Sequence, residues 1–322
     1  MLYSTNQPRD KLFMRNTISY SCNIMQLVIL MAGEGSRFAT AGYYTTPKPL
    51  ITVEGKPIIA HILDMFKGVT DVTFVCSNTL LKTKDARQIL TDLCPTGRII
   101  EVPSHNLGPA HTLKNIFTYL KNDEPVIISY ADFTQNWNFA AFQENVAPGN
   151  IAGAVPCYTG FHPHLLHKNL YAGVTIDDKS RMTSIKEKFS FTKNPEDSYH
   201  SSGIYYFSSV TLLETYTREL LASGRTVNGE YYVSMLYELL LRDNLLVYVS
   251  PVSHFMQWGI PEDLEEYEAW SRLIHNENYL HKKPTEIPSS RAELVKIPYR
   301  SDSLNYQKCH QYWSSAILKR TW

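Results

Sequence analysis

The stretch Leu27-Val-Ile-Leu-Met-Ala-Gly-Glu-Gly-Ser-Arg-Phe38 runs from an apolar segment into a glycine loop that ends in an arginine. A short apolar run before glycines is typical of a buried strand. Gly33 and Gly35 permit positive φ and allow backbone N–H groups to approach phosphate oxygens. Arg37 adds a planar, permanent positive charge that suits phosphate. The stretch therefore predicts a strand, a phosphate-binding loop and a helix.

A second stretch follows, Thr46-Pro-Lys-Pro-Leu-Ile-Thr-Val-Glu-Gly-Lys-Pro57. It places Lys48 between two prolines that restrict its backbone, which offers a second cation close to the loop. Two familiar phosphate loops are excluded by their spelling. The dinucleotide fingerprint G-x-G-x-x-G would need glycine where Phe38 stands, and the pattern G-x-x-x-x-G-K-[ST] does not occur in the chain.

From Gln26 onward, apolar strand-like runs alternate with helical periodicity, which is typical of βαβ units. The expected strands are 26–31, 71–76, 98–102, 125–130, 151–155, 171–176, 182–186, 202–207 and 245–249. The expected helices are 58–66, 110–120, 209–221, 229–241 and one that begins at Pro261. We expect a Rossmann-like α/β fold with a mixed, mostly parallel sheet flanked by helices, and a small additional lobe where the strands crowd together after Asn150.

Changes in sequence pattern and composition along the chain also suggest domain boundaries. Residues 1–24 look like a loose extension, residues 25–275 like the main domain, and residues 276–322 like a tail of different composition. The tail carries Tyr312, Trp313 and Trp322, and large aromatic side chains usually need a surface to pack on. We expect the tail to dock on the body of the protein or on a partner.

Composition excludes several classes of protein. The 322 residues include 31 basic and 31 acidic side chains, so the chain lacks the positive charge of a general nucleic-acid binder. Its five cysteines form no C-x-x-C pair, which argues against zinc and disulfides and suits a reducing cytoplasm. No apolar run approaches the roughly 18 residues of a membrane helix. We therefore expect a cytoplasmic protein that is not inserted in a membrane.

Together the two motif halves resemble the nucleoside-triphosphate transferase family, which includes sugar-1-phosphate nucleotidylyltransferases and phosphocholine cytidylyltransferases. The hallmark of that family is L-A-A-G-x-G-x-R followed by P-K-P-L and G-K-P, and both halves occur here in order. Later segments follow the family's order as well: Leu107–Ala110, Ile127–Asp132, Ile185–Lys188, Ser202–Tyr205, Gly229–Tyr232 and Trp258–Leu264. The resemblance is closest to members found in bacterial surface-polysaccharide gene sets.

The resemblance implies attack by a phosphomonoester on the α-phosphorus of a nucleoside triphosphate, with release of pyrophosphate. Because both reactants are anions, such an enzyme mainly neutralises charge and positions its substrates. By resemblance, Arg37 binds the leaving phosphates, Lys48 meets the α-phosphate and Lys188 binds the phosphate of the acceptor. The implied nucleotide cradle comprises Met31, Ala32, Gly33, Glu34, Gly35 and Ser36, and the implied segment near the base comprises Asn106, Gly108, Pro109 and Ala110.

The resemblance also implies a magnesium ion on Asp132, which follows an apolar strand. Many relatives place a second aspartate before a late G-T-P motif, but Gln257 stands there and brings no negative charge, so the metal count stays open. Asp132 as a turn residue and Lys188 as a solvated lysine remain alternative interpretations. Asp263, in the first turn of the last predicted helix, is expected to be structural.

We therefore expect a magnesium-dependent nucleotidylyltransferase with a mild preference for CTP. It would act on a phosphorylated sugar or small phosphorylated metabolite for surface-polysaccharide assembly, and a homo-oligomer is compatible with this reading. A catalytically silent nucleotide-binding subunit stays open because of Gln257. A glycosyltransferase would need a D-x-D-like site, but Ala131-Asp132-Phe133 has one acid.

The run Phe161–His167 contains three histidines but no cysteine or carboxylate at ligand spacing, which argues against a zinc site. His162 could instead line the acceptor pocket.

Overall fold

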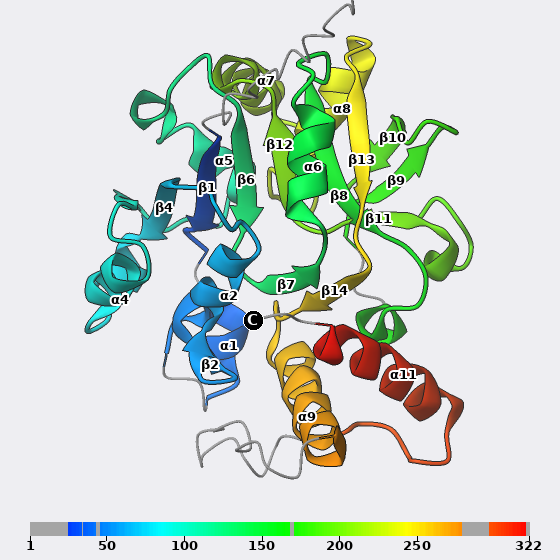
Figure 1. The fold of residues 1–322 in the computed structure, drawn as a ribbon. Helices are drawn as coiled ribbons and strands as arrows, with labels where there is room; N and C mark the ends of the chain where they lie inside the picture. Colours follow the sequence, from blue (N-terminus) through cyan, green and yellow to red (C-terminus); the bar gives the residue numbers. More distant parts are fainter. Residues whose placement is uncertain (1–24, 34, 43–45, 168–170, 279–295, 320–322) are drawn as a thin grey trace, which may run out of the picture.

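The computed structural model describes residues 25–33, 35–42, 46–167, 171–278 and 296–319 (Figure 1). The predicted extension 1–24, Glu34 of the glycine loop and Trp322 of the tail lie outside these described residues. Within them the chain has the predicted α/β fold, in which a large mixed sheet is flanked by helices. The fold class is therefore confirmed.

The main sheet has ten strands in the order β10-β9-β11-β8-β12-β6-β1-β4-β5, with β13 paired to β8. Their bounds are β1 Gln26–Met31, β4 Asp71–Ser77, β5 Arg98–Val102, β6 Val126–Tyr130, β8 Gly153–Tyr158, β9 Gly173–Ile176, β10 Met182–Lys186, β11 Tyr199–Ser201, β12 Ile204–Phe207 and β13 Val247–Pro251. The strands β6, β1, β4 and β5 run parallel, whereas β12, β11, β9 and β10 pair antiparallel with their neighbours.

Two small ribbons stand apart from this sheet. One pairs β2 Thr52–Val53 with β3 Lys56–Pro57, and the other pairs β7 Phe133–Asn136 with β14 His254–Gln257. In the second ribbon Gln257 pairs with Phe133, the residue after Asp132. This pairing brings two predicted site residues together although they are far apart in the sequence.

Helices cover both faces of the sheet. They are α1 Ser36–Thr40, α2 Ile58–Asp64, α3 Asn78–Leu81, α4 Ala86–Leu93, α5 Pro109–Leu113, α6 Phe139–Val146, α7 Val210–Ser223, α8 Ser234–Arg242, α9 Pro261–Asn278 and α11 Leu304–Leu318, with 3₁₀ turns at Lys48–Leu50, Phe117–Tyr119, Pro163–His167 and Pro195–Asp197. On β1, Leu27 and Ile29 join the core shared with α2, α4 and α6, while Val28 joins the core shared with α5, α7 and α8. This alternation follows from the two-residue period of a strand buried on both faces.

Two predicted helices differ from the structure. The expected helix 110–120 ends at Leu113 and continues as a turn and a short 3₁₀ segment, where Asn115 and the residues after it have low helix propensity. The expected helix 229–241 begins only at Ser234. Its first residues form a turn instead, because the backbone of Tyr231 bonds to Leu107 and Ala110 in another loop.

The described part of the tail forms α11, which packs against α9 (Figure 1). Tyr312 and Trp313 are buried there. The Tyr312 hydroxyl donates a hydrogen bond to the carbonyl of Phe255 at 2.7 Å, and the Asn136 amide donates one to the carbonyl of Ala316 at 2.8 Å. The tail thus supports both strands of the β7–β14 ribbon.

Candidate functional site

A pocket of about 550 Å³ opens at the carboxyl ends of β1, β4 and β6. This is the edge at which open α/β sheets bind ligands, because loops from neighbouring parallel strands meet there. The pocket is lined by Met31, Ala32, Gly33, Gly35, Arg37, Lys48, Asn106, Gly108, Pro109, Asp132, Lys188 and Gln257 among the predicted residues. The structure thus brings most of the predicted site into one cavity.

The glycine loop borders this pocket between β1 and α1. Gly35 has φ of 62°, in the left-handed region that the sequence predicted for it, whereas Gly33 does not have positive φ. Apart from its chain neighbours, no described residue has an atom within 4 Å of a Cβ built at Gly33, so packing in the described part of the chain does not require glycine there. Since Gly33 lines the pocket, the space beside it is available to a ligand. Ser36 is the first residue of α1.

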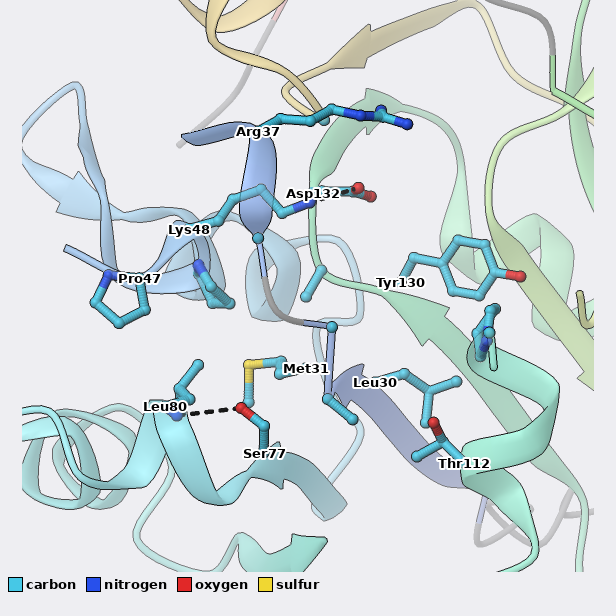
Figure 2. A pocket seen from close by; sticks show the side chains of 18 of the residues that line it. Leu30, Met31, Arg37, Pro47, Lys48, Ser77, Leu80, Thr112, Tyr130 and Asp132 are labelled. Carbon is cyan, nitrogen blue, oxygen red and sulfur yellow. Dashed lines mark hydrogen bonds and ion pairs between the residues drawn. The ribbon is translucent and has the colours of Figure 1, made fainter. Parts of the chain in front are cut away.

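Lys48 and Asp132 form an ion pair inside the pocket. The Nζ atom of Lys48 lies 3.0 Å from Oδ2 of Asp132, and their side chains are 21% and 26% exposed. Figure 2 shows the two side chains pointing toward each other from opposite elements. Lys48 begins the 3₁₀ turn after the first proline of its motif, and Asp132 lies between β6 and β7. The pair joins one positive and one negative group at the centre of the site.

Arg37 supplies the second cation from α1. Its side chain lines the pocket, and in Figure 2 it extends over the region of Lys48 and Asp132. Within the described residues the Arg37 guanidinium forms no ion pair with a carboxylate. A guanidinium with unused donors in a pocket is well suited to bind phosphate oxygens in a bidentate manner.

Gln257 lies beside Asp132, as the ribbon pairing requires. A Cβ atom added at Gly259 would lie 3.4 Å from Oδ2 of Asp132 and 3.9 Å from Cδ of Gln257, so glycine keeps the space between them open. The Gln257 amide nitrogen donates to Asp263, while its oxygen is buried and finds no hydrogen-bond partner among the described residues. Burial raises the pKa of Asp263 to about 7.

These donors suit a hard divalent cation. Mg²⁺ prefers oxygen ligands and is commonly held by one or two carboxylates together with substrate phosphates. Asp132 offers a carboxylate and Gln257 a neutral amide oxygen. The described part of the chain contains no group of three or more His, Cys, Asp or Glu side chains that could hold a metal. Substrate phosphates and water would supply the remaining ligands of such an ion.

Lys188 lines the pocket from the antiparallel part of the sheet, just after β10. The strand β10 ends at Lys186, and Lys188 follows with φ of 53°, so the two lysines are not consecutive members of one strand face. Its Nζ atom lies 5.5 Å from the ring centroid of Tyr171 and 5.7 Å from that of Tyr232. It is also 3.9 Å from a carboxylate oxygen of Glu187. Lys188 thus lines the pocket near two aromatic rings, with 37% of its side chain exposed.

Glu187 beside it is a buried acid that the sequence analysis did not select. Its carboxylate accepts a hydrogen bond from the Ser234 hydroxyl, and burial raises the pKa of the carboxyl. The preceding strand and the Glu-Lys segment signal its position, but its burial depends on α8, which follows much later in the chain.

The predicted segment near the base lies on the opposite side of the pocket. Asn106, Gly108 and Pro109 line the cavity, but Ala110 does not. Ala110 is fully buried, and its N–H donates to the carbonyl of Tyr231 at 2.9 Å. The prediction of a ligand contact for Ala110 was therefore wrong: its backbone holds the loop in place.

His162 does not line the pocket. It is 1% exposed, and its ring lies between two backbone groups: Nε2 accepts from the N–H of Phe255, and Nδ1 faces the carbonyl of Gly160. Burial lowers the pKa of His162 to about 3. This histidine is a neutral structural residue under the β7–β14 ribbon.

Several lining residues were not selected from the sequence. They are mostly tyrosines and short polar side chains: Ser77, Thr79, His105, Thr112, Tyr130, Tyr171, Tyr205, Glu230 and Tyr232. Tyr130, Tyr205, Glu230 and Tyr232 fall within segments already singled out, so a signal for them was present.

Among the described residues, no helix is both long and apolar enough to span a bilayer.

The chain is similar to a known domain family and to a curated protein. Residues 27–185 match the MobA-like NTP transferase domain family. The bifunctional protein GlmU of Syntrophomonas wolfei is 22% identical over 278 residues, which cover 84% of this chain and 56% of that protein, so the chain spans little more than half the length of this curated relative.

Two solved structures share the fold. The nucleoside-diphosphate-sugar pyrophosphorylase of Vibrio cholerae RC9 superposes with a TM-score of 0.61 at 20% identity, over 74% of this chain and 97% of that one. The inositol-1-phosphate CTP transferase of T. maritima superposes with a TM-score of 0.56 at 14% identity, over 74% and 91%.

Proposed function

We propose that this protein is a nucleotidyltransferase, because residues 27–185 match the MobA-like NTP transferase domain family. It joins a nucleoside triphosphate to a phosphorylated sugar or other small phosphorylated metabolite and releases pyrophosphate. The observation that carries the proposal is the convergence of Arg37, Lys48 and Asp132 on one pocket beside the glycine loop. The names of two structural neighbours, a nucleoside-diphosphate-sugar pyrophosphorylase and an inositol-1-phosphate CTP transferase, support the same reaction class.

The reaction joins two anions, so the positive groups have separate tasks. Arg37, whose guanidinium has no carboxylate partner among the described residues, binds the β- and γ-phosphates that leave as pyrophosphate. Lys48 lies deeper in the pocket beside Asp132 and stabilises the negative charge that grows on the α-phosphate oxygens during attack. No covalent intermediate with the protein is needed, because binding both substrates in line supplies most of the catalysis.

Asp132 and Gln257 would hold a magnesium ion in the proposed site. When bound, the ion would supply positive charge that neutralises and orients the phosphates. Lys48, which pairs with Asp132 at 3.0 Å, is close enough to this point to contact a phosphate oxygen of the nucleotide. Gly33 and Gly35 leave room for phosphate oxygens to contact the backbone of the loop.

The acceptor phosphate belongs at the other charged end of the pocket. Lys188 lies there near the rings of Tyr171 and Tyr232, where its ammonium group can pair with the phosphate. The product would serve surface-polysaccharide assembly in the cytoplasm, and CTP is the triphosphate we favour. The four described cysteines are free thiols, which agrees with that compartment.

The test is a pyrophosphate-release assay on the purified chain with magnesium. It crosses four nucleoside triphosphates with a panel of phosphorylated sugars, phosphorylated alcohols and phosphorylated amides. Release above background with one nucleotide–acceptor pair, lost in Arg37→Ala, supports the proposal. Arg218→Ala is a matched control, because Arg218 is exposed on α7 and pairs with Glu214 outside the pocket.

The negative outcome has a clear meaning. Tight nucleotide binding without release of pyrophosphate from any pair would indicate a silent binding subunit. Release of a free nucleoside diphosphate from a nucleotide sugar would instead indicate a glycosyltransferase. Either result would overturn the proposed reaction.

A further inference from the structure

Gln257 lies between the pocket of the candidate active site and a second, much smaller cavity. It is 3% exposed and lines both. The small cavity has a volume of about 10 Å³ and is otherwise lined by Pro163, His164, Phe255, Asp263, Glu266 and Trp313. In Figure 1 the strand β14, which ends at Gln257, leads directly into α9, whose first turn carries Asp263. Gln257 therefore connects the active-site pocket with the start of α9.

The backbone places the Gln257 amide next to Asp132. Gln257 pairs with Phe133 across the β7–β14 ribbon, and the N–H of Trp258 donates a hydrogen bond to the Asp132 carbonyl at 2.8 Å. A Cβ atom built at Gly259 would lie within 4 Å of both the Asp132 carboxylate and the Gln257 amide carbon. The two side chains therefore border the same space, as two ligands of one cation must.

A glutamine at such a position can face the cation in two ways. The two oxygens of a carboxylate are equivalent, but an amide has an oxygen that accepts and an NH₂ group that only donates. Mg²⁺ takes oxygen ligands. The Gln257 amide therefore serves as a ligand in only one of its two orientations, and some other group has to select that orientation.

Asp263 is the group that selects it. The Gln257 amide nitrogen donates a hydrogen bond to Oδ2 of Asp263, which holds the NH₂ end of the amide against α9. The amide oxygen is the other branch of the same group. It is buried and has no hydrogen-bond partner among the described residues, which is unfavourable until a cation or donor satisfies it.

The burial of Asp263 has no explanation in the start of α9 itself. An acid in the first turn interacts favourably with the helix dipole, but Glu262 in the same turn does so while exposed to water. Asp263 is 6% exposed and borders the small cavity together with Glu266, which is 5% exposed. Burying a carboxyl group beside a second one is unfavourable. A role beyond the helix start is therefore needed, and the hydrogen bond to Gln257 supplies it.

We propose that Asp263 is a positioning residue for the metal site: it holds the nitrogen of Gln257 so that the amide oxygen is presented to a divalent cation beside Asp132. Asp263 acts as a hydrogen-bond acceptor, so its negative charge is not required. The inference rests on the proposed function, because it needs the metal that Asp132 and Gln257 would hold.

The test measures metal binding directly, with Mn²⁺ as a paramagnetic substitute for Mg²⁺. Electron paramagnetic resonance gives the Mn²⁺ affinity in the presence of CTP, UTP, ATP or GTP, and the nucleotide that binds most tightly is kept. Asp263→Leu removes the acceptor and keeps a branched side chain of similar size. Loss of a residue that orients a metal ligand typically lowers metal affinity about 10-fold to 100-fold, so we expect a fall of at least about tenfold.

A conservative variant separates the hydrogen bond from the charge. Asp263→Asn keeps an acceptor oxygen without a charge, so its Mn²⁺ affinity should stay within about threefold of the unchanged chain. Affinity for the same nucleotide in EDTA, measured by calorimetry, should be equal in all variants because no metal is bound. Should Asp263→Leu not fold, Asp263→Ala removes the same acceptor and carries the same expectation.

Two controls separate positioning from folding. Glu262→Leu removes the neighbouring acid of the same turn, which is exposed and lines neither cavity, and should leave Mn²⁺ affinity unchanged. Gln257→Ala should lose at least as much affinity as Asp263→Leu, and combining the two should cost little more than Gln257→Ala alone, because the residues act as one unit. Urea unfolding checks that each variant is folded.

The outcomes distinguish this inference from the proposed function. Unchanged Mn²⁺ affinity in Asp263→Leu, in a chain whose pyrophosphate release is intact, would overturn the role of Asp263 alone. Equal losses in Asp263→Asn and Asp263→Leu would also overturn it, because the charge would then be the cause, and so would a matching loss of nucleotide affinity in EDTA. No binding of Mn²⁺ or of any nucleotide by the unchanged chain would overturn both.

Discussion

Replacing Lys48 with methionine removes the cation that lies 3.0 Å from Asp132 and keeps an unbranched side chain of similar length. A cation about 4 Å from a developing negative charge contributes about 4 kcal/mol at an effective dielectric constant near 20. Measured losses for one preorganised donor are about 10²–10³ in rate, or about 2.7–4 kcal/mol. We expect kcat/KM to fall by about 10²–10³. A partly exposed ion pair contributes only about 0–1 kcal/mol to stability, so the variant should remain folded.

The assay is steady-state pyrophosphate release at saturating acceptor, alongside urea unfolding of both proteins. Lys121→Met is the matched control, because Lys121 also lies 3.0 Å from an aspartate, Asp71, but at the far edge of the sheet from the pocket residues. It should turn over normally. Turnover of Lys48→Met within fivefold of the unchanged chain, at equal stability, would refute the assignment of the α-phosphate to Lys48.

Three further perturbations test other parts of the argument. Asp132→Asn should weaken Mn²⁺ binding in the presence of nucleotide at least tenfold, and an unchanged electron paramagnetic resonance titration would contradict the metal site. Burial lowers the pKa of His162 to about 3, whereas the pKa in the unfolded chain is about 6.5, so this histidine takes up a proton on unfolding in mild acid. Its contribution to the free energy of unfolding is complete above pH 6.5 and falls by about 2 kcal/mol between pH 7 and pH 5. This contribution should be absent from the pH profile of His162→Gln. Tyr312→Phe leaves the buried carbonyl of Phe255 without its 2.7 Å donor, so the free energy of unfolding should drop by about 1–3 kcal/mol, and an unchanged urea midpoint would show that the tail does not support the ribbon.

Much of the fold could be predicted because its strands are buried on both faces. The segments 26–31, 98–102 and 182–186 agree with β1, β5 and β10 residue for residue, since continuous or alternating apolar runs bounded by polar turns leave little freedom. The glycine loop, Arg37 and Lys48 could be placed at the site because their spacing is local.

Features that depend on distant pairing could not be predicted. The strand β7 reads Phe-Thr-Gln-Asn, which shows no apolar alternation, and it becomes a strand only because β14 pairs with it about 120 residues later. The role of Ala110 likewise depends on how its loop folds against Tyr231, which lies about 120 residues later.

The support that α11 gives to the β7–β14 ribbon has a consequence for biosynthesis. Asn136 holds the carbonyl of Ala316, 180 positions further along the chain. At about 5–20 residues per second, a ribosome needs roughly 10–40 s to travel that distance. During this interval β7 lacks first its partner strand β14 and then the contact with α11, so the ribbon that carries Gln257 beside Asp132 is completed only after α11 has been made.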